Sequence, residues 1–229
     1  FESGLLSIIL IDLVLAGDNA IVIALAARSL PHHLQKKAIF WGTFGAIAVR
    51  VALTAIVVYL LKLPGLMLAG GLLLLPIAWK LLRQDDSDQP HLKEAAGFWA
   101  AIQTIVVADA LMGLDNVLAI AGAAKGHLGL VVLGLLISVP LVVWGSTLIL
   151  KLIERFPIVI YIGAGAIAWT SARMIAHDHF TKAWFDSHEP MRWVLDAVLV
   201  AGICGLGWWV EKRVKARKAL AQAHTANPT

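Results

Sequence analysis

The sequence Asp12-Leu-Val-Leu-Ala-Gly-Asp18-Asn19 occurs a second time, in altered form, as Asp109-Ala-Leu-Met-Gly-Leu-Asp115-Asn116. The two copies are 97 residues apart, since 109 minus 12 and 115 minus 18 give the same difference. Each copy lies well inside an apolar stretch that is long enough to cross a membrane. Two acids and an amide at the same spacing are difficult to attribute to chance likeness between Leu- and Ala-rich helices. The pattern therefore predicts an internal repeat of a membrane-embedded segment.

The composition points to the same environment. Of the 229 residues, 59% are hydrophobic and only 15% are charged, and the mean hydropathy is +0.80. A soluble domain is roughly 45–50% apolar and about 25% charged. This excess excludes a disordered chain and, despite a net charge of +4, a nucleic-acid binder. The single cysteine, Cys204, excludes an internal disulfide framework and a thiolate metal cluster. Because the chain does not begin with Met, we expect further residues upstream.

The apolar segments predict an all-α, polytopic membrane protein with seven transmembrane helices. A spanning helix needs about 20 mainly apolar residues. The segments that qualify are 3–27, 38–61, 65–82, 98–123, 128–150, 157–176 and 193–210.

The distribution of lysine and arginine predicts the orientation, because these residues are enriched in cytoplasmic loops. With the N-terminus outside, thirteen of the nineteen cations lie on the cytoplasmic side, five lie outside, and Arg50 lies within a span. We therefore expect an outside N-terminus, a basic cytoplasmic tail over 211–229 and a multi-pass location in the cell (inner) membrane.

The repeat extends beyond the two acidic motifs. Pro64-Gly-Leu-Met-Leu-Ala-Gly70 corresponds to Pro157-Ile-Val-Ile-Tyr-Ile-Gly163. We expect a single transmembrane transporter domain over 1–229, with one repeat over about 3–83, a second over about 98–176 and an additional helix over 193–210. Three spans is an odd number, so the second copy enters the membrane from the opposite side. Such an inverted 3+3 repeat is typical of secondary transporters, whose substrate site lies near the midplane.

Four aspartates, Asp12, Asp18, Asp109 and Asp115, are the candidate functional groups. An aspartate at the centre of a spanning helix costs about 2.5–3.5 kcal/mol, so its default interpretation is functional. Asn19 shares a helix face with Asp12, and Asn116 shares one with Asp109, since each pair is seven residues apart. Helix breaks at Gly17 and Gly113 would turn Asp18 and Asp115 inward and release backbone carbonyls as ligands. A purely structural role, as helix caps or as partners of Arg50, is the alternative.

The ligand chemistry is that of hard oxygen donors, which suits Mg²⁺, Mn²⁺ or Ca²⁺. Four ionised aspartates around one divalent ion leave a net charge of about −2, which is costly in a medium of low dielectric constant. Some of these acids are therefore expected to bind protons when the metal is absent. Exchange of metal for protons follows naturally, and Arg50 is a candidate charge partner. No organic cofactor and no enzymatic nucleophile–base arrangement is indicated by the sequence.

These residues resemble the TerC family of integral membrane proteins, within the wider lysine-exporter superfamily. The resemblance rests on the two Asp-Asn pairs and on the 3+3+1 helix plan, and it is closest to the short, single-module members. It implies export of Mn²⁺ for metal homeostasis, with the Asp and Asn residues of the first and fourth helices as ligands. The open alternatives are transport of Ca²⁺ or another cation, and a non-transporting membrane scaffold with a structural ion. The sequence does not indicate the oligomeric state or a protein partner.

Overall fold

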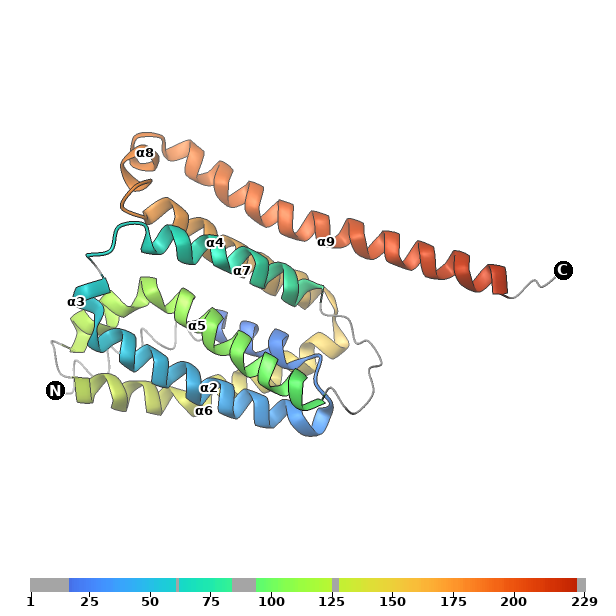
Figure 1. Ribbon diagram of the computed structural model, residues 1–229, viewed down its shortest axis with the longest axis horizontal. Coiled ribbons are helices and arrows are strands. Elements are labelled where there is room, and N and C mark those ends of the chain that lie inside the picture. Colours follow the sequence, from blue (N-terminus) through green and yellow to red (C-terminus); the bar gives the residue numbers. More distant parts are fainter. Residues whose placement is uncertain (1–16, 61, 84–93, 125–127, 226–229) are drawn as a thin grey trace.

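A computed structural model of the chain describes residues 17–60, 62–83, 94–124 and 128–225. These residues are helical almost throughout, and no strand occurs among them. The helical segment Gly17–Ala27 precedes the labelled elements of Figure 1. The labelled helices are α2 (His32–Ala55), α3 (Val57–Leu60), α4 (Leu66–Leu82), α5 (Glu94–Ala124), α6 (Leu128–Arg155), α7 (Ile158–His177), α8 (Lys182–Ser187) and α9 (Glu189–Thr225).

Five helices in this part of the chain are long and apolar enough to cross a membrane. Two shorter apolar helices, Gly17–Ala27 and Leu66–Leu82, also fall within predicted spans. The all-helical, multi-pass architecture is therefore confirmed, whereas the count of seven spans, the inverted repeat and the orientation stay predictions. The five long segments are His32–Ala55, Ala96–Leu114, Leu128–Arg155, Ile158–His177 and Glu189–Arg217.

The helices extend beyond the predicted spans at several ends. α2 begins at His32, before the predicted span 38–61, and α9 continues to Thr225, well beyond the predicted span 193–210. Hydrophobicity marks only the part of a helix that lies in lipid, and a helix can continue into water on polar residues. The predicted span 38–61 is interrupted at Ile56, between α2 and α3.

The helices lie roughly alongside one another (Figure 1), and contacts between them give their directions. Gly42 of α2 faces Ile105 of α5, and Arg50 faces Gly113 further along both helices, so α2 and α5 run parallel. Asp178, after α7, bonds to Leu68 near the start of α4, so α4 and α7 run antiparallel. These directions are those expected of consecutive spans that alternate across a membrane.

Glycines allow the closest helix approaches. A Cβ at Gly42 would lie 2.6 Å from Cδ1 of Ile105. A Cβ at Gly71 of α4 would lie 2.8 Å from the backbone oxygen of Ser171 on α7, whose hydroxyl donates a 2.6 Å hydrogen bond to the Gly71 carbonyl. Small residues at helix interfaces are the usual means of close packing in membranes, where no hydrophobic force drives helices together.

A buried aspartate and a partly buried arginine contact the two ends of the short helix α4. At its N-terminus, a carboxylate oxygen of Asp178 accepts a 3.0 Å hydrogen bond from the Leu68 N–H. At its C-terminus, Arg28 donates a 3.0 Å hydrogen bond to the carbonyl oxygen of Leu81. An anion at the start and a cation at the end satisfy otherwise unpaired backbone groups and complement the helix dipole. Both contacts therefore stabilise a 17-residue helix whose ends would otherwise be unfavourable near lipid.

Candidate functional site

Asp109 and Arg50 form a buried ion pair between α5 and α2. Nη2 of Arg50 lies 2.5 Å from Oδ1 of Asp109, and the two side chains are 4% and 7% exposed. The close approach of α2 to α5 is made by Gly42, and Gly113 lies next to the Arg50 guanidinium. Taking two charges out of water is costly, and the pair is retained only where geometry offsets that cost. The structure thus places a charge-compensated carboxylate inside a predicted span.

Asp18 and Asn19 lie at the start of the described segment Gly17–Ala27. Asn19 is buried, and Asp18 is half-buried. Arg173 of α7 lies within electrostatic range of Asp18. The Arg173 guanidinium is also 5.2 Å from the ring centroid of Trp169, one turn earlier on the same helix. A second acidic residue of the repeated motif therefore interacts electrostatically with an arginine of another helix.

The second motif lies on α5, which is one continuous helix from Glu94 to Ala124. A helix break at Gly113 was expected and is not found, because the backbone stays helical through Leu114 and Asp115. Asn116 donates a 3.4 Å hydrogen bond to the Met112 carbonyl, so its amide is turned towards its own helix.

Part of the predicted constellation lies outside the described residues. This holds for Asp12, for the side chain of Asp115 and for the chain before Gly17, so the helix break expected at Gly17 falls at the edge of the described residues. The hydrogen bond described for Asp109 goes to Arg50, and the one described for Asn116 goes to Met112 on its own helix. The described side chains also include no group of three or more His, Cys, Asp or Glu residues that could hold a metal ion. The proposed metal ligands therefore stay a prediction.

Sequence reasoning missed two of these charged residues. Arg173 was not among the candidate site residues, yet it interacts electrostatically with Asp18. Asp178 was not among them either, yet it is only 2% exposed and caps α4. The one available signal for Arg173 was its alignment with Lys80 in the repeat.

The fold and this set of buried charges define a polytopic helical membrane protein. Residues 2–216 match the TerC family of integral membrane proteins, and the chain belongs to this family. Among solved structures, none matches this chain.

Several bacterial membrane proteins are similar to it. The uncharacterized membrane protein YjbE of Bacillus subtilis (strain 168) is 46% identical over 198 residues, which cover 86% of this chain and 90% of that protein. The protein YegH of Escherichia coli (strain K12) is 29% identical over 177 residues, 69% of this chain but only 33% of that protein. The uncharacterized membrane protein YkoY of Bacillus subtilis (strain 168) is 25% identical over 194 residues, 76% of this chain and 60% of that protein.

Proposed function

We infer that this chain is a secondary transporter of the cell (inner) membrane that exports a divalent metal, Mn²⁺ in the first place, from the cytoplasm. Membership of the TerC family is consistent with a membrane transporter. The proposal adds the substrate, the direction and the site. The proposed ligands are Asp12, Asp18, Asn19, Asp109, Asp115 and Asn116.

The observation that carries the proposal is the buried carboxylate of Asp109 with its arginine partner inside a predicted span. Ionisable groups within spanning helices usually serve transport or proton transfer, because their insertion is otherwise unfavourable. Buried carboxylate and amide oxygens are also the donors that Mn²⁺, Mg²⁺ and Ca²⁺ accept.

The formal charges of the proposed site add a second argument. Four aspartates contribute −4, and Arg50 with Arg173 contributes +2, so the empty site carries −2. One divalent ion neutralises this charge, and so do two protons. Because a net charge at the midplane is costly, the site is expected to hold either the metal or two protons. Electroneutral exchange of one metal ion for two protons is the mechanism that this arithmetic favours.

A structural role is the second candidate, and the Arg50–Asp109 pair is the observation in its favour. A pair of this kind can hold α2 against α5 without any transported ion. The protein would then be a membrane scaffold, and its acids would serve packing. Transport of Ca²⁺ or of another cation is a further alternative within the transporter class.

Metal flux into liposomes that contain only this protein tests the proposal. We expect Mn²⁺ flux that requires an opposing proton gradient and is lost in Asp18→Asn and in Asp115→Asn. Asp186→Asn is the matched control, because Asp186 is exposed on α8. Folded protein without flux of Mn²⁺, Ca²⁺ or Mg²⁺ favours the scaffold. Flux retained in both aspartate variants refutes the proposed site.

A further inference from the structure

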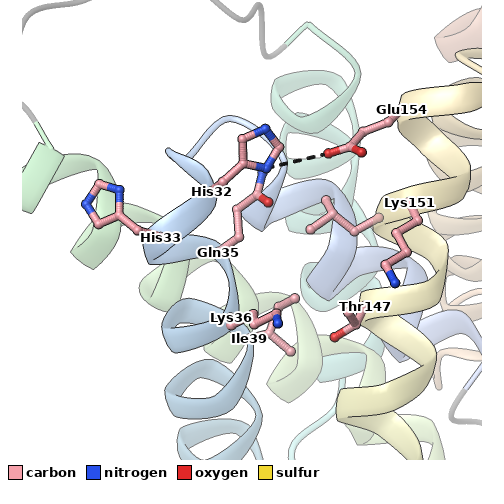
Figure 2. A pocket seen from close by; sticks show the side chains of 9 residues that line it. His32, His33, Gln35, Lys36, Ile39, Thr147, Lys151 and Glu154 are labelled. Atoms are coloured by element: carbon pink, nitrogen blue, oxygen red, sulfur yellow. Dashed lines mark ion pairs between the residues drawn. The ribbon is translucent and has the colours of Figure 1, made fainter.

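A pocket of about 510 Å³ lies between the start of α2 and the end of α6 (Figure 2). Ile39 and Leu150, both buried, form part of its wall. The pocket lies at one end of the helix bundle, because α2 begins at His32 and α6 ends at Arg155. In a chain that spans a membrane, the end of a bundle lies at the level of the lipid headgroups. By the predicted orientation this is the cytoplasmic end.

Two lysines and one glutamate are the formally charged residues of the pocket lining. Lys36 of α2 and Lys151 of α6 reach it from facing helices, and His32 and His33 belong to its lining (Figure 2). Among the described residues, neither lysine has a hydrogen-bond or ion-pair partner. Glu154 is the one acidic lining residue, and it is 3.8 Å from the exposed ring of His32. Cationic charge of this kind repels Mn²⁺, so the pocket is not suited to be the metal entrance.

The first turn of α2 adds to the positive potential. It contains no acidic residue, and the Pro31 N-cap supplies no side-chain hydrogen bond. The N–H groups of the first turn and the positive end of the helix dipole therefore favour an anion at this end of α2.

Apolar side chains continue from each lysine along the outer surface of its helix. Phe40 and Phe44 follow Lys36 at intervals of four residues, so they share its face of α2, and they are 48% and 51% exposed. On α6, Leu148 and Trp144 precede Lys151 by three and seven residues and are 52% and 68% exposed. Each lysine thus stands at the end of a lipid-facing apolar stripe.

We propose that this pocket binds an anionic glycerophospholipid, with the phosphate at Lys36 and Lys151 and the acyl chains along the two stripes. A free phosphate ion shares the headgroup chemistry, but it makes no use of the exposed apolar surface below the lysines. Clusters of basic residues at the cytoplasmic surface also attract anionic lipids. This assignment does not depend on the metal transport proposed above.

Titration of the purified full-length protein in detergent with dioctanoyl phosphatidylglycerol, followed by native mass spectrometry, tests the assignment. We expect saturable binding, weakened about tenfold in Lys36→Gln/Lys151→Gln, since each lysine near an anionic lipid is worth about a factor of five or less. Lys62→Gln/Lys182→Gln removes the same charge from the other end of the bundle and should bind as the wild type does. Glu154→Gln should bind several-fold more tightly, because the one carboxylate of the lining is lost.

The controls separate the sources of binding. Equal binding of dioctanoyl phosphatidylcholine overturns the proposal, because the pocket would then not select lipids by the negative charge of the headgroup. Competition by inorganic phosphate at concentrations similar to those of the lipid overturns it in favour of a free-anion site. Equal weakening in the two double variants overturns it, because binding would then depend on the total charge of the protein and not on this pocket. If the Lys36→Gln/Lys151→Gln variant does not fold, unchanged or weaker binding in Glu154→Gln overturns it.

Discussion

The Arg50 guanidinium lies 2.5 Å from the Asp109 carboxylate, and this contact joins α2 to α5 within the buried part of the helix bundle. In the predicted repeat, residue 142 occupies the position that corresponds to Arg50, and it is a valine. The pair therefore has no counterpart in the second copy of the predicted repeat. It gives one of the two acidic motifs a fixed cation from a neighbouring helix.

Removal of one partner of this pair is expected to destabilise the protein strongly. Arg50→Leu leaves a buried carboxylate without its arginine, which costs about 3–5 kcal/mol. Arg50→Leu/Asp109→Leu is expected to recover at least half of that loss, because a buried apolar pair of similar volume is tolerated. Thermal unfolding in detergent measures both effects. A double variant no more stable than Arg50→Leu would contradict this explanation.

An exposed pair provides the control. Lys215 lies 2.5 Å from Glu211 on α9, and both side chains are solvent-accessible. Lys215→Ala should change the free energy of unfolding by less than about 0.5 kcal/mol, because exposed pairs four residues apart contribute little. The difference between the two losses of stability then measures the effect of burial, because both variants remove one charge of an ion pair.

Close packing at Gly163 gives a second prediction. A Cβ there would lie 2.5 Å from Cγ2 of Ile21 and 2.7 Å from Cδ1 of Leu25, so the segment Gly17–Ala27 would have to move away from α7. Gly163→Ala should destabilise the protein by about 1–3 kcal/mol. Gly202→Ala on α9, where a Cβ meets nothing within 4 Å, should be neutral or stabilising by up to about 1 kcal/mol. Equal unfolding temperatures for the two variants would show that the α7 contact is not tight.

The same contact bears on the predicted repeat. Gly70 of α4 and Gly163 of α7 occupy corresponding positions in the two copies. A Cβ at Gly70 would lie 2.8 Å from Cε of Met174 on α7 and 3.3 Å from Cδ1 of Leu114 on α5, whereas Gly163 faces Ile21 and Leu25 of the segment Gly17–Ala27. The third helix of each predicted repeat thus packs against the first helix of the other. Sequence similarity alone aligned the two glycines, and the inverted repeat itself stays a prediction.

Much of the fold could be predicted from the sequence, because membrane insertion depends on long apolar segments. Apart from Ile56 and the first residues of the spans 65–82 and 157–176, the predicted spans are helical in the residues that the structure describes. The short helix α8 was not predicted, since six residues give no periodic signal, and the interruption that separates α3 from α2 within the span 38–61 was not predicted either. The polar extension of α9 was missed because hydropathy does not report helix formation in water.

The surroundings of the candidate site were less accessible to sequence reasoning. The acids could be identified because they interrupt apolar segments, but their partners depend on how helices pack. Arg173 and Asp178 are separated from Asp18 and Leu68 by more than 100 positions in the chain, and no local pattern links them. Gly113 illustrates the opposite error, because a glycine permits a helix break without requiring one.

The cap on α4 gives a third prediction. Asp178 accepts hydrogen bonds of 3.0 Å from the N–H groups of Leu68 and Phe180, and it is almost fully buried. Asp178→Ala should lower the free energy of unfolding by about 1–2 kcal/mol, as expected for loss of a helix cap. Asp178→Asn should lose less, because an amide oxygen still accepts one of the two bonds. Asp186→Ala, at an exposed position of α8, is the control and should match the wild-type unfolding temperature.

The predicted orientation can be tested with single cysteines, because Cys204 is the one native thiol. In a Cys204→Ser background, His188→Cys places a thiol at the exposed turn before α9, and Lys37→Cys places one near the exposed start of α2. These positions lie at opposite ends of the bundle, since α7 and α9 are joined at one end and α2 begins at the other. A membrane-impermeant maleimide added to intact cells should label His188→Cys and should label Lys37→Cys only after permeabilisation. The reverse pattern would invert the assignment and place the basic tail outside, against the charge distribution from which the orientation was predicted.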